Sequence, residues 1–174
     1  MSHSMLISHS VLVLSLDSLI AAAALSAAVR ARHYAPLALS FGACDLAASS
    51  VAPMLNAHLA ASSLVPMLDA RLLALGSLVP WLLLSGMLIL SGSANSARSQ
   101  NLSAAAYLLP PLFALDNLIS PATSPVPAGL VSCAMAAAGF VLGAAVLHGL
   151  APPAQRPLWA AGLAVVAIAL QLAG

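Results

Sequence analysis

Three aspartates lie inside apolar stretches of the sequence, where an ionised carboxylate is costly to place. Asp17 lies in LSLDSLIAAAAL, Asp45 in FGACDLAASS and Asp116 in FALDNLIS. At the centre of a membrane helix each would cost about 2.5–3.5 kcal/mol on insertion scales. The five arginines all fall in predicted loops or at the ends of apolar runs, so the chain offers these acids no buried basic partner. They must be protonated, hydrated in a cavity or paired with a ligand, and a bound cation satisfies the last condition.

Oxygen-bearing side chains accompany each aspartate within about one helical turn. Carboxylate, amide and hydroxyl oxygens are the ligands that the hard cations Mn²⁺, Mg²⁺ and Ca²⁺ prefer. Soft ligands are sparse, because no histidine lies deep within a predicted span. The predicted metal site consists of Asp17, Asp45, Asp116, Asn117 and Ser49.

Three carboxylates around one divalent ion would retain one net negative charge. Crowded carboxylates favour binding a proton, because like charges repel at short range. One proton could therefore be exchanged each time the metal binds and leaves. This arithmetic predicts proton-coupled transport of the cation.

The composition places the chain among membrane proteins. Of the 174 residues, 62% are hydrophobic and 5% are charged, whereas a soluble domain has about 25% charged residues. The mean hydropathy is +1.06, and the sequence contains neither lysine nor glutamate. A net charge of +1 gives no reason to expect nucleic acid as a partner.

Six apolar runs are long enough to be candidate membrane spans, since a span needs about 20 residues. Turn-forming segments separate them, and the loops are too short to hold a soluble domain, so we predict a single transmembrane domain over 1–174. Whether the second span continues through 56–69, or a short interfacial helix lies there, is open. The predicted spans cover about 5–29, 36–58, 72–90, 102–119, 128–150 and 158–172.

Arginine placement predicts the orientation of the chain in its membrane. Arg30 and Arg32 follow the first span, Arg98 the third and Arg156 the fifth, against Arg71 alone on the other side. The positive-inside rule then puts loops one, three and five in the cytoplasm and both termini outside. We do not expect the first run to be a cleaved signal peptide, because an aspartate interrupts it and no Lys or Arg precedes it.

The segments SLDSLIAAA and ALDNLISPA share the frame L-D-x-L-I, which indicates an internal repeat. One repeat would cover about 5–92 and the other about 102–172. Three spans per half would insert the halves with opposite orientation, as in many transporters. We therefore predict an all-α membrane protein of six transmembrane helices in two inverted three-helix repeats. On the first predicted helix, Asp17, Ala21 and Ala24 share a face that we expect to pack against other helices.

Trp81 and Trp159 lie near the ends of predicted spans, and we expect their side chains to anchor the chain at the membrane interface.

Three motifs, S-L-D-S-L, F-G-A-C-D-L-A-A-S and A-L-D-N-L, resemble those of the MntP-type manganese efflux pumps, within the LysE superfamily of membrane exporters. The closing run AAGLAVVAIALQLAG is also similar to that family's last helix. The resemblance implies a bacterial inner-membrane exporter in which Asp17, Asp45 and Asp116 bind Mn²⁺. The chain departs from the family at Asp45, where glutamate is common, and at Asn117, where alanine is common. Its loop between the halves is also shorter.

We therefore expect a divalent cation exporter, for manganese in the first instance, that works by proton-coupled alternating access with the lipid bilayer as its surroundings. The alternatives are an exporter of another small cation or solute in the same superfamily, or a non-transport scaffold subunit. An amino acid substrate is disfavoured, because no basic residue inside the membrane could bind its carboxylate. We expect no enzymatic activity and no cofactor, since no nucleophile–base pair or cofactor motif occurs. The sequence leaves the metal, the direction, the proton stoichiometry and the oligomeric state open.

Overall fold

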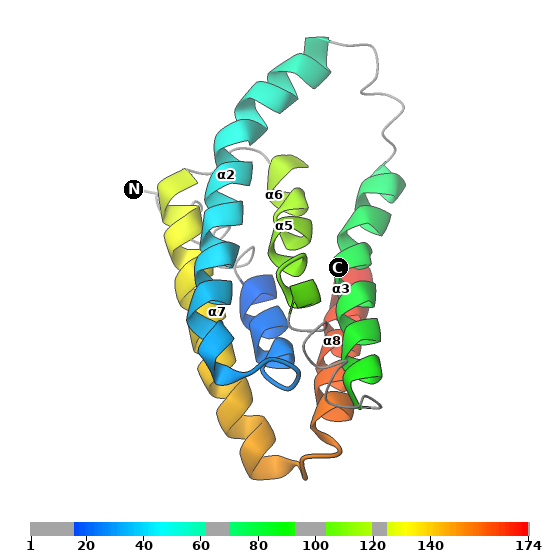
Figure 1. Cartoon of the computed structure of the whole chain (residues 1–174). Helices are drawn as coiled ribbons and strands as arrows, with labels where there is room; N and C mark the ends of the chain where they lie inside the picture. The colour runs from blue at the N-terminus through cyan, green and yellow to red at the C-terminus, as the bar shows by residue number, and fades with distance from the viewer. Residues whose placement is uncertain (1–15, 62–69, 93–103, 120–124, 174) are drawn as a thin grey trace, which may run out of the picture.

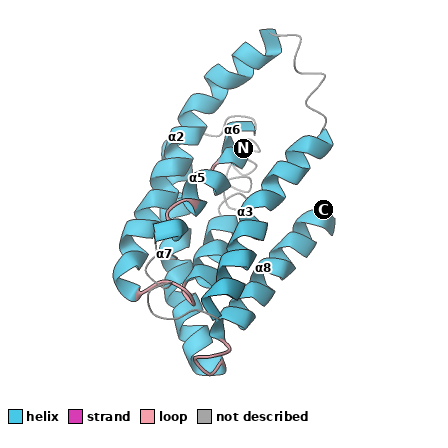
Figure 2. Ribbon diagram, turned by 45° about the vertical axis from the view of Figure 1, so that its right-hand side comes forward, coloured by secondary structure: helices cyan, strands magenta, loops and turns pink. Residues whose placement is uncertain are grey.

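The computed structural model describes residues 16–61, 70–92, 104–119 and 125–173 (Figure 1). Regular secondary structure in these ranges is entirely helical, with no strand (Figure 2). The predicted all-α class is therefore confirmed for the described part of the chain.

Helices occupy all six ranges that the sequence predicted as spans. α2 extends to Ala61, so the second predicted span continues past residue 56, while 62–69 lies outside the described residues. Of the first predicted span, 5–15 likewise lies outside them. In chain order the helices are an unlabelled first helix at Leu16–Leu25, η1 (Ala31–His33), α2 (Tyr34–Ala61), α3 (Ala70–Gly92), α5 (Leu109–Phe113), α6 (Leu115–Ile119), α7 (Pro125–Leu150) and α8 (Arg156–Ala173).

Two helices are long enough and apolar enough to cross a membrane. They are α2 and α7, of 28 and 26 residues, and each exceeds the roughly 20 residues that a span requires. In the other helices the apolar part that the structure describes is shorter. Examples are Leu78–Ser91 in α3 and Arg156–Ala169 in α8. The number of spans beyond these two stays a prediction.

The fourth predicted span is not one continuous helix. Pro110 and Pro111 occupy the first turn of α5, where the missing proline N–H costs no helical hydrogen bond. α5 ends at Phe113, Ala114 forms a turn, and α6 then carries Asp116 and Asn117. The helix is thus interrupted at Ala114, within one turn of Asp116 and Asn117. Pro53, by contrast, lies within the continuous helix α2.

The longer helices pack as two antiparallel pairs. α2 lies along α7, and α3 lies along α8, with the members of each pair running in opposite directions (Figure 1; Figure 2). α5 and α6 contact α2 and also α3, so they lie between the two pairs. The pairing brings together segments from opposite halves of the chain.

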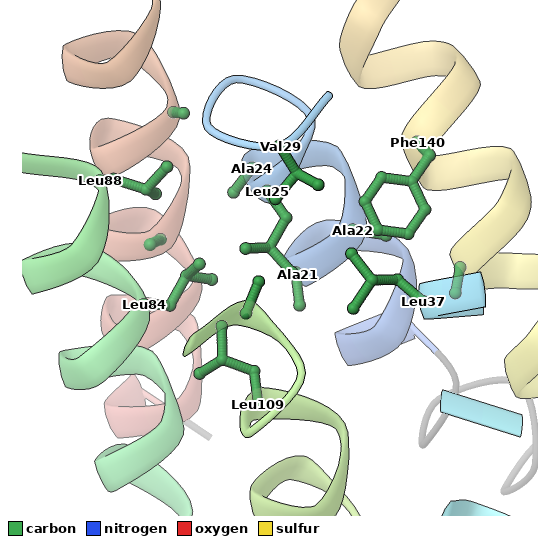
Figure 3. Close-up of a cluster of buried hydrophobic side chains, with 14 of the residues drawn as sticks. Ala21, Ala22, Ala24, Leu25, Val29, Leu37, Leu84, Leu88, Leu109 and Phe140 are labelled. Carbon is green, nitrogen blue, oxygen red and sulfur yellow. The ribbon is translucent and has the colours of Figure 1, made fainter. Parts of the chain in front are cut away.

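The first helix lies at the centre of the core. Its residues Ala21, Ala22, Ala24 and Leu25 are completely buried. Around them lie side chains from the other elements, namely Leu37, Leu84, Leu88, Leu109 and Phe140 (Figure 3). Burial of Ala21 and Ala24 confirms that the small-residue face packs against other helices.

Trp81 does not lie at an interface, so the prediction that it anchors the membrane surface is wrong. Its side chain is completely buried, and its ring meets the edge of Phe113 at a centroid distance of 4.9 Å. The reason is tertiary: α3 contacts α5 and α8, and Trp81 fills the space between packed helices. Trp159 on α8 is 56% exposed, as an anchoring role requires.

Candidate functional site

Asp45 is the buried acid around which the candidate site is built. It lies within α2 and is only 5% exposed. The amide Nδ2 of Asn117 donates a hydrogen bond of 2.8 Å to its Oδ1. Two of the predicted site residues, from opposite halves of the chain, are therefore in direct contact.

A second polar contact joins the other side of the site. Ser132 of α7 is completely buried, and its Oγ lies 2.7 Å from the Oγ of Ser18 on the first helix. Its hydroxyl also lies close to the Asp45 carboxyl group. Ser18, Ser132, Asp45 and Asn117 thus form a continuous row of polar side chains, which we call the polar chain. It links the first helix, α7, α2 and α6.

Two glycines bring α2 and α7 close enough for these contacts. A Cβ atom on Gly42 would lie 2.7 Å from the carbonyl oxygen of Gly129, and one on Gly129 would lie 2.8 Å from that of Gly42. Real Cβ atoms do not approach other atoms so closely, so only glycine fits at either position. Asp45 and Ser132 each follow one of these glycines by three residues, almost one helical turn, and so lie beside the point of closest approach.

The remaining predicted ligands lie near the polar chain. Asp17 is half-buried and immediately precedes Ser18. Ser49 is 4% exposed and lies one turn after Asp45 on the same face of α2. Asp116 belongs to α6 and immediately precedes Asn117, while its side chain lies outside the described residues.

The described side chains do not by themselves complete a metal site. Among them no group of three His, Cys, Asp or Glu residues is close enough to hold an ion. Asp45 and Asn117 are brought together, whereas convergence of Asp17 and Asp116 on Asp45 stays a prediction. No arginine in the described ranges forms an ion pair with Asp45, and the hydrogen bond from Asn117 offsets part of the cost of burying it.

Reasoning from the sequence missed Ser132. A serine in an alanine-rich run is usually a small packing residue, and nothing nearby marks it. One signal was present: Gly129-Leu-Val-Ser132 has the same spacing as Gly42-Ala-Cys-Asp45. Ser132 thus follows its glycine by the same number of residues as Asp45 follows Gly42.

Substitution of Ser132 by alanine is expected to lower stability by about 1 kcal/mol. The change removes partners of both Ser18 and Asp45, and interhelical hydrogen bonds in membranes average about 0.6 kcal/mol, with more for charged acceptors. Thermal unfolding in detergent would measure the loss, and a double-mutant cycle with Ser18→Ala should give a coupling energy of at least about 0.5 kcal/mol. Ser50→Ala is the matched control, because Ser50 is exposed and bonds only the Leu46 carbonyl of its own helix. Additive effects of S18A and S132A would contradict the polar chain.

The polar chain offers a carboxylate, an amide oxygen and hydroxyl oxygens at the junction of four helices. Such a set can bind a hard cation, or it can hold a proton on the carboxyl group. No protein-family model matches the chain, and no curated protein or solved structure is detectably similar to it.

Proposed function

We propose that the chain is a membrane transporter that exports a divalent cation, Mn²⁺ in the first instance, in exchange for protons. The observation that carries this proposal is the buried Asp45 carboxyl group, held by Asn117 and Ser132 with no basic partner among the described residues. A packing scaffold has little use for an acid that is buried without a basic partner at a junction of helices. A transporter uses one to replace the hydration shell of its ion.

The outer surface of the bundle supports membrane insertion. Large apolar side chains are widely exposed on α2, α3, α7 and α8, such as Met54 at 75%, Leu130 at 67% and Leu82 at 61%. Soluble proteins rarely expose contiguous apolar surface on this scale. We infer that lipid covers these faces and that all six helical ranges lie in the bilayer.

The pairing of helices supports two inverted repeats. The second helix of one half packs on the second helix of the other, α2 on α7, and the third packs on the third, α3 on α8, both antiparallel (Figure 1). The polar contacts follow the same relation. Ser18, which follows Asp17, bonds Ser132 of α7, and Asn117, which follows Asp116, bonds Asp45 of α2. Two inverted repeats would place a pseudo-two-fold axis between Asp45 and Ser132.

The orientation of the bundle agrees with the arginine distribution. η1, which contains Arg32 and follows Arg30, lies at the same end as the connection from α7 to α8, which leads into Arg156 (Figure 1). The start of α3, which contains Arg71, lies at the opposite end. We therefore propose that the first end faces the cytoplasm of a bacterium and that both termini lie outside.

The proposed site uses Asp45 as the central ligand. Asp17 and Asp116 precede members of the polar chain by one residue, so their backbones already lie beside the site. Asn117 would turn its amide oxygen to the ion, and Ser49, one turn from Asp45, would supply a hydroxyl. With no metal bound, a proton on one of the carboxyl groups would replace part of the ion's charge, which couples metal release to proton uptake.

Metal binding to the purified protein tests the proposal. In detergent or nanodiscs, Mn²⁺ should raise the unfolding midpoint by mass action, and by more than Mg²⁺, Zn²⁺ or Cd²⁺ at equal concentration. Cells that express the chain should also grow at manganese concentrations that inhibit cells with the empty vector. A midpoint unchanged by every metal, together with no protection of cells, would contradict transport and favour the scaffold alternative.

A further inference from the structure

We propose that the groove between the end of α7 and the start of α8 binds one anionic phospholipid, with an acyl chain in the groove and the phosphate on Arg156. The inference rests on the membrane placement proposed above, but not on metal transport. Its chemistry comes from two adjacent features, an apolar space and a cation at one end of it.

The groove has a volume of about 580 Å³ and is lined almost wholly by apolar side chains. This lies within the range of about 300–1,000 Å³ that is usual for ligand sites. Trp159 and Gly162 of α8 line one side, and Leu150 of α7 lines the other. A Cβ atom added to Gly162 would meet no atom within 4 Å, so the two helices leave this space unfilled.

A cation lies at the end of the groove where the two helices join. Arg156 is the first residue of α8, and its Nε donates a hydrogen bond of 3.2 Å to the carbonyl oxygen of Ala151, which lines the groove. This bond fixes the guanidinium group, and its two terminal nitrogens have no partner among the described residues. They remain available to bind two oxygens of a phosphate.

The local charge favours an anionic headgroup over a zwitterionic one. The segment 144–166 contains no Asp or Glu that could compete for Arg156. The N-terminal end of α8 adds partial positive charge from its unpaired N–H groups. Trp159 is 56% exposed beside this end, where an amphipathic ring suits the boundary between headgroups and acyl chains. Basic pockets between helices at a membrane surface bind anionic lipids in the same manner.

Lipid binding to the metal-free protein in detergent tests the proposal, by native mass spectrometry and by thermal unfolding. Dioleoyl phosphatidylglycerol should bind and raise the unfolding midpoint more than dioleoyl phosphatidylcholine. Arg156→Gln should weaken phosphatidylglycerol binding by about tenfold or more, because it removes the charge-assisted hydrogen bonds to the phosphate. Gly162→Leu should abolish binding of both lipids at this site by filling the groove.

Matched variants separate the lipid site from general effects. Arg30→Gln removes an exposed arginine from another connection, and Gly86→Leu adds the same side chain at another helical glycine with open space around it. Both should bind phosphatidylglycerol as the parent does, and inorganic phosphate alone should leave the midpoint unchanged. Parental lipid binding by R156Q or G162L, or an equal effect of free phosphate, would overturn the proposal. Because no metal is present, these results do not depend on manganese export.

Discussion

Under the proposed function, replacement of Asp45 by asparagine is expected to reduce manganese export to the background of cells that lack the chain. Asparagine has nearly the same shape, but it cannot supply the negative charge that offsets a divalent ion. The fold should tolerate the change, because a neutral amide inside the bundle avoids the cost of a buried carboxylate. The unfolding midpoint of D45N should therefore equal or exceed that of the parent, while its shift with Mn²⁺ disappears.

Two other variants make this result specific to the site. Asp45→Glu keeps the charge and lengthens the side chain by one methylene group, so it should retain measurable export. Asp69→Asn removes a carboxylate from a segment that the sequence places between predicted spans, and it should protect cells as the parent does. Protection of manganese-stressed cells by D45N at the parental level would exclude Asp45 as the central ligand.

Substitution of Gly143 or Gly139 by alanine is expected to destabilise the bundle by several degrees or prevent its folding. Added Cβ atoms would overlap the backbone of the first helix, at Ala23 for Gly143 and at Leu19 for Gly139. Backbone atoms cannot move aside as a flexible side chain can, so α7 and the first helix must separate. Overpacking of this kind costs about 1–3 kcal/mol, and each 1 kcal/mol lowers the midpoint of a chain this size by about 2–4 °C.

The same substitution elsewhere on α7 is the control. A Cβ atom on Gly149 would meet nothing within 4 Å. Gly149→Ala should therefore cause no loss of stability, since alanine is favoured over glycine within a helix. Thermal unfolding of the three variants in one detergent gives the comparison. Equal midpoints for G143A and G149A would mean that α7 does not approach the first helix as closely as described.

Much of the secondary structure could be predicted from the sequence because helix position depends on local composition. The predicted span 128–150 corresponds to α7 at Pro125–Leu150, and 72–90 corresponds to α3 at Ala70–Gly92. The predicted span 102–119 is interrupted between α5 and α6, and the sequence did not predict the residue at which it breaks. Pro110 and Pro111 mark only where a helix can begin. Trp81 was misassigned because the position of a tryptophan along a span depends on which helices surround it.

The candidate site was predicted in part, for a physical reason. Asp45 and Asn117 were chosen as ligands of one metal ion; the structure brings their side chains together, and the ion itself stays a prediction. Ser132 was missed because its importance depends on α2 and α7 meeting at Gly42 and Gly129. No local pattern around a serine carries information about a helix so distant in sequence.

By itself, the sequence determined that the chain is helical and apolar and that it has few charged residues, because these properties depend only on residue type and local spacing. The tertiary structure decided which helices meet. It placed α2 against α7 and α3 against α8, buried the first helix at the centre, and joined Asp45 to Asn117 and Ser132. Such contacts depend on the fit of distant surfaces, above all on glycines that let two backbones approach, and that fit exists only once the helices are packed.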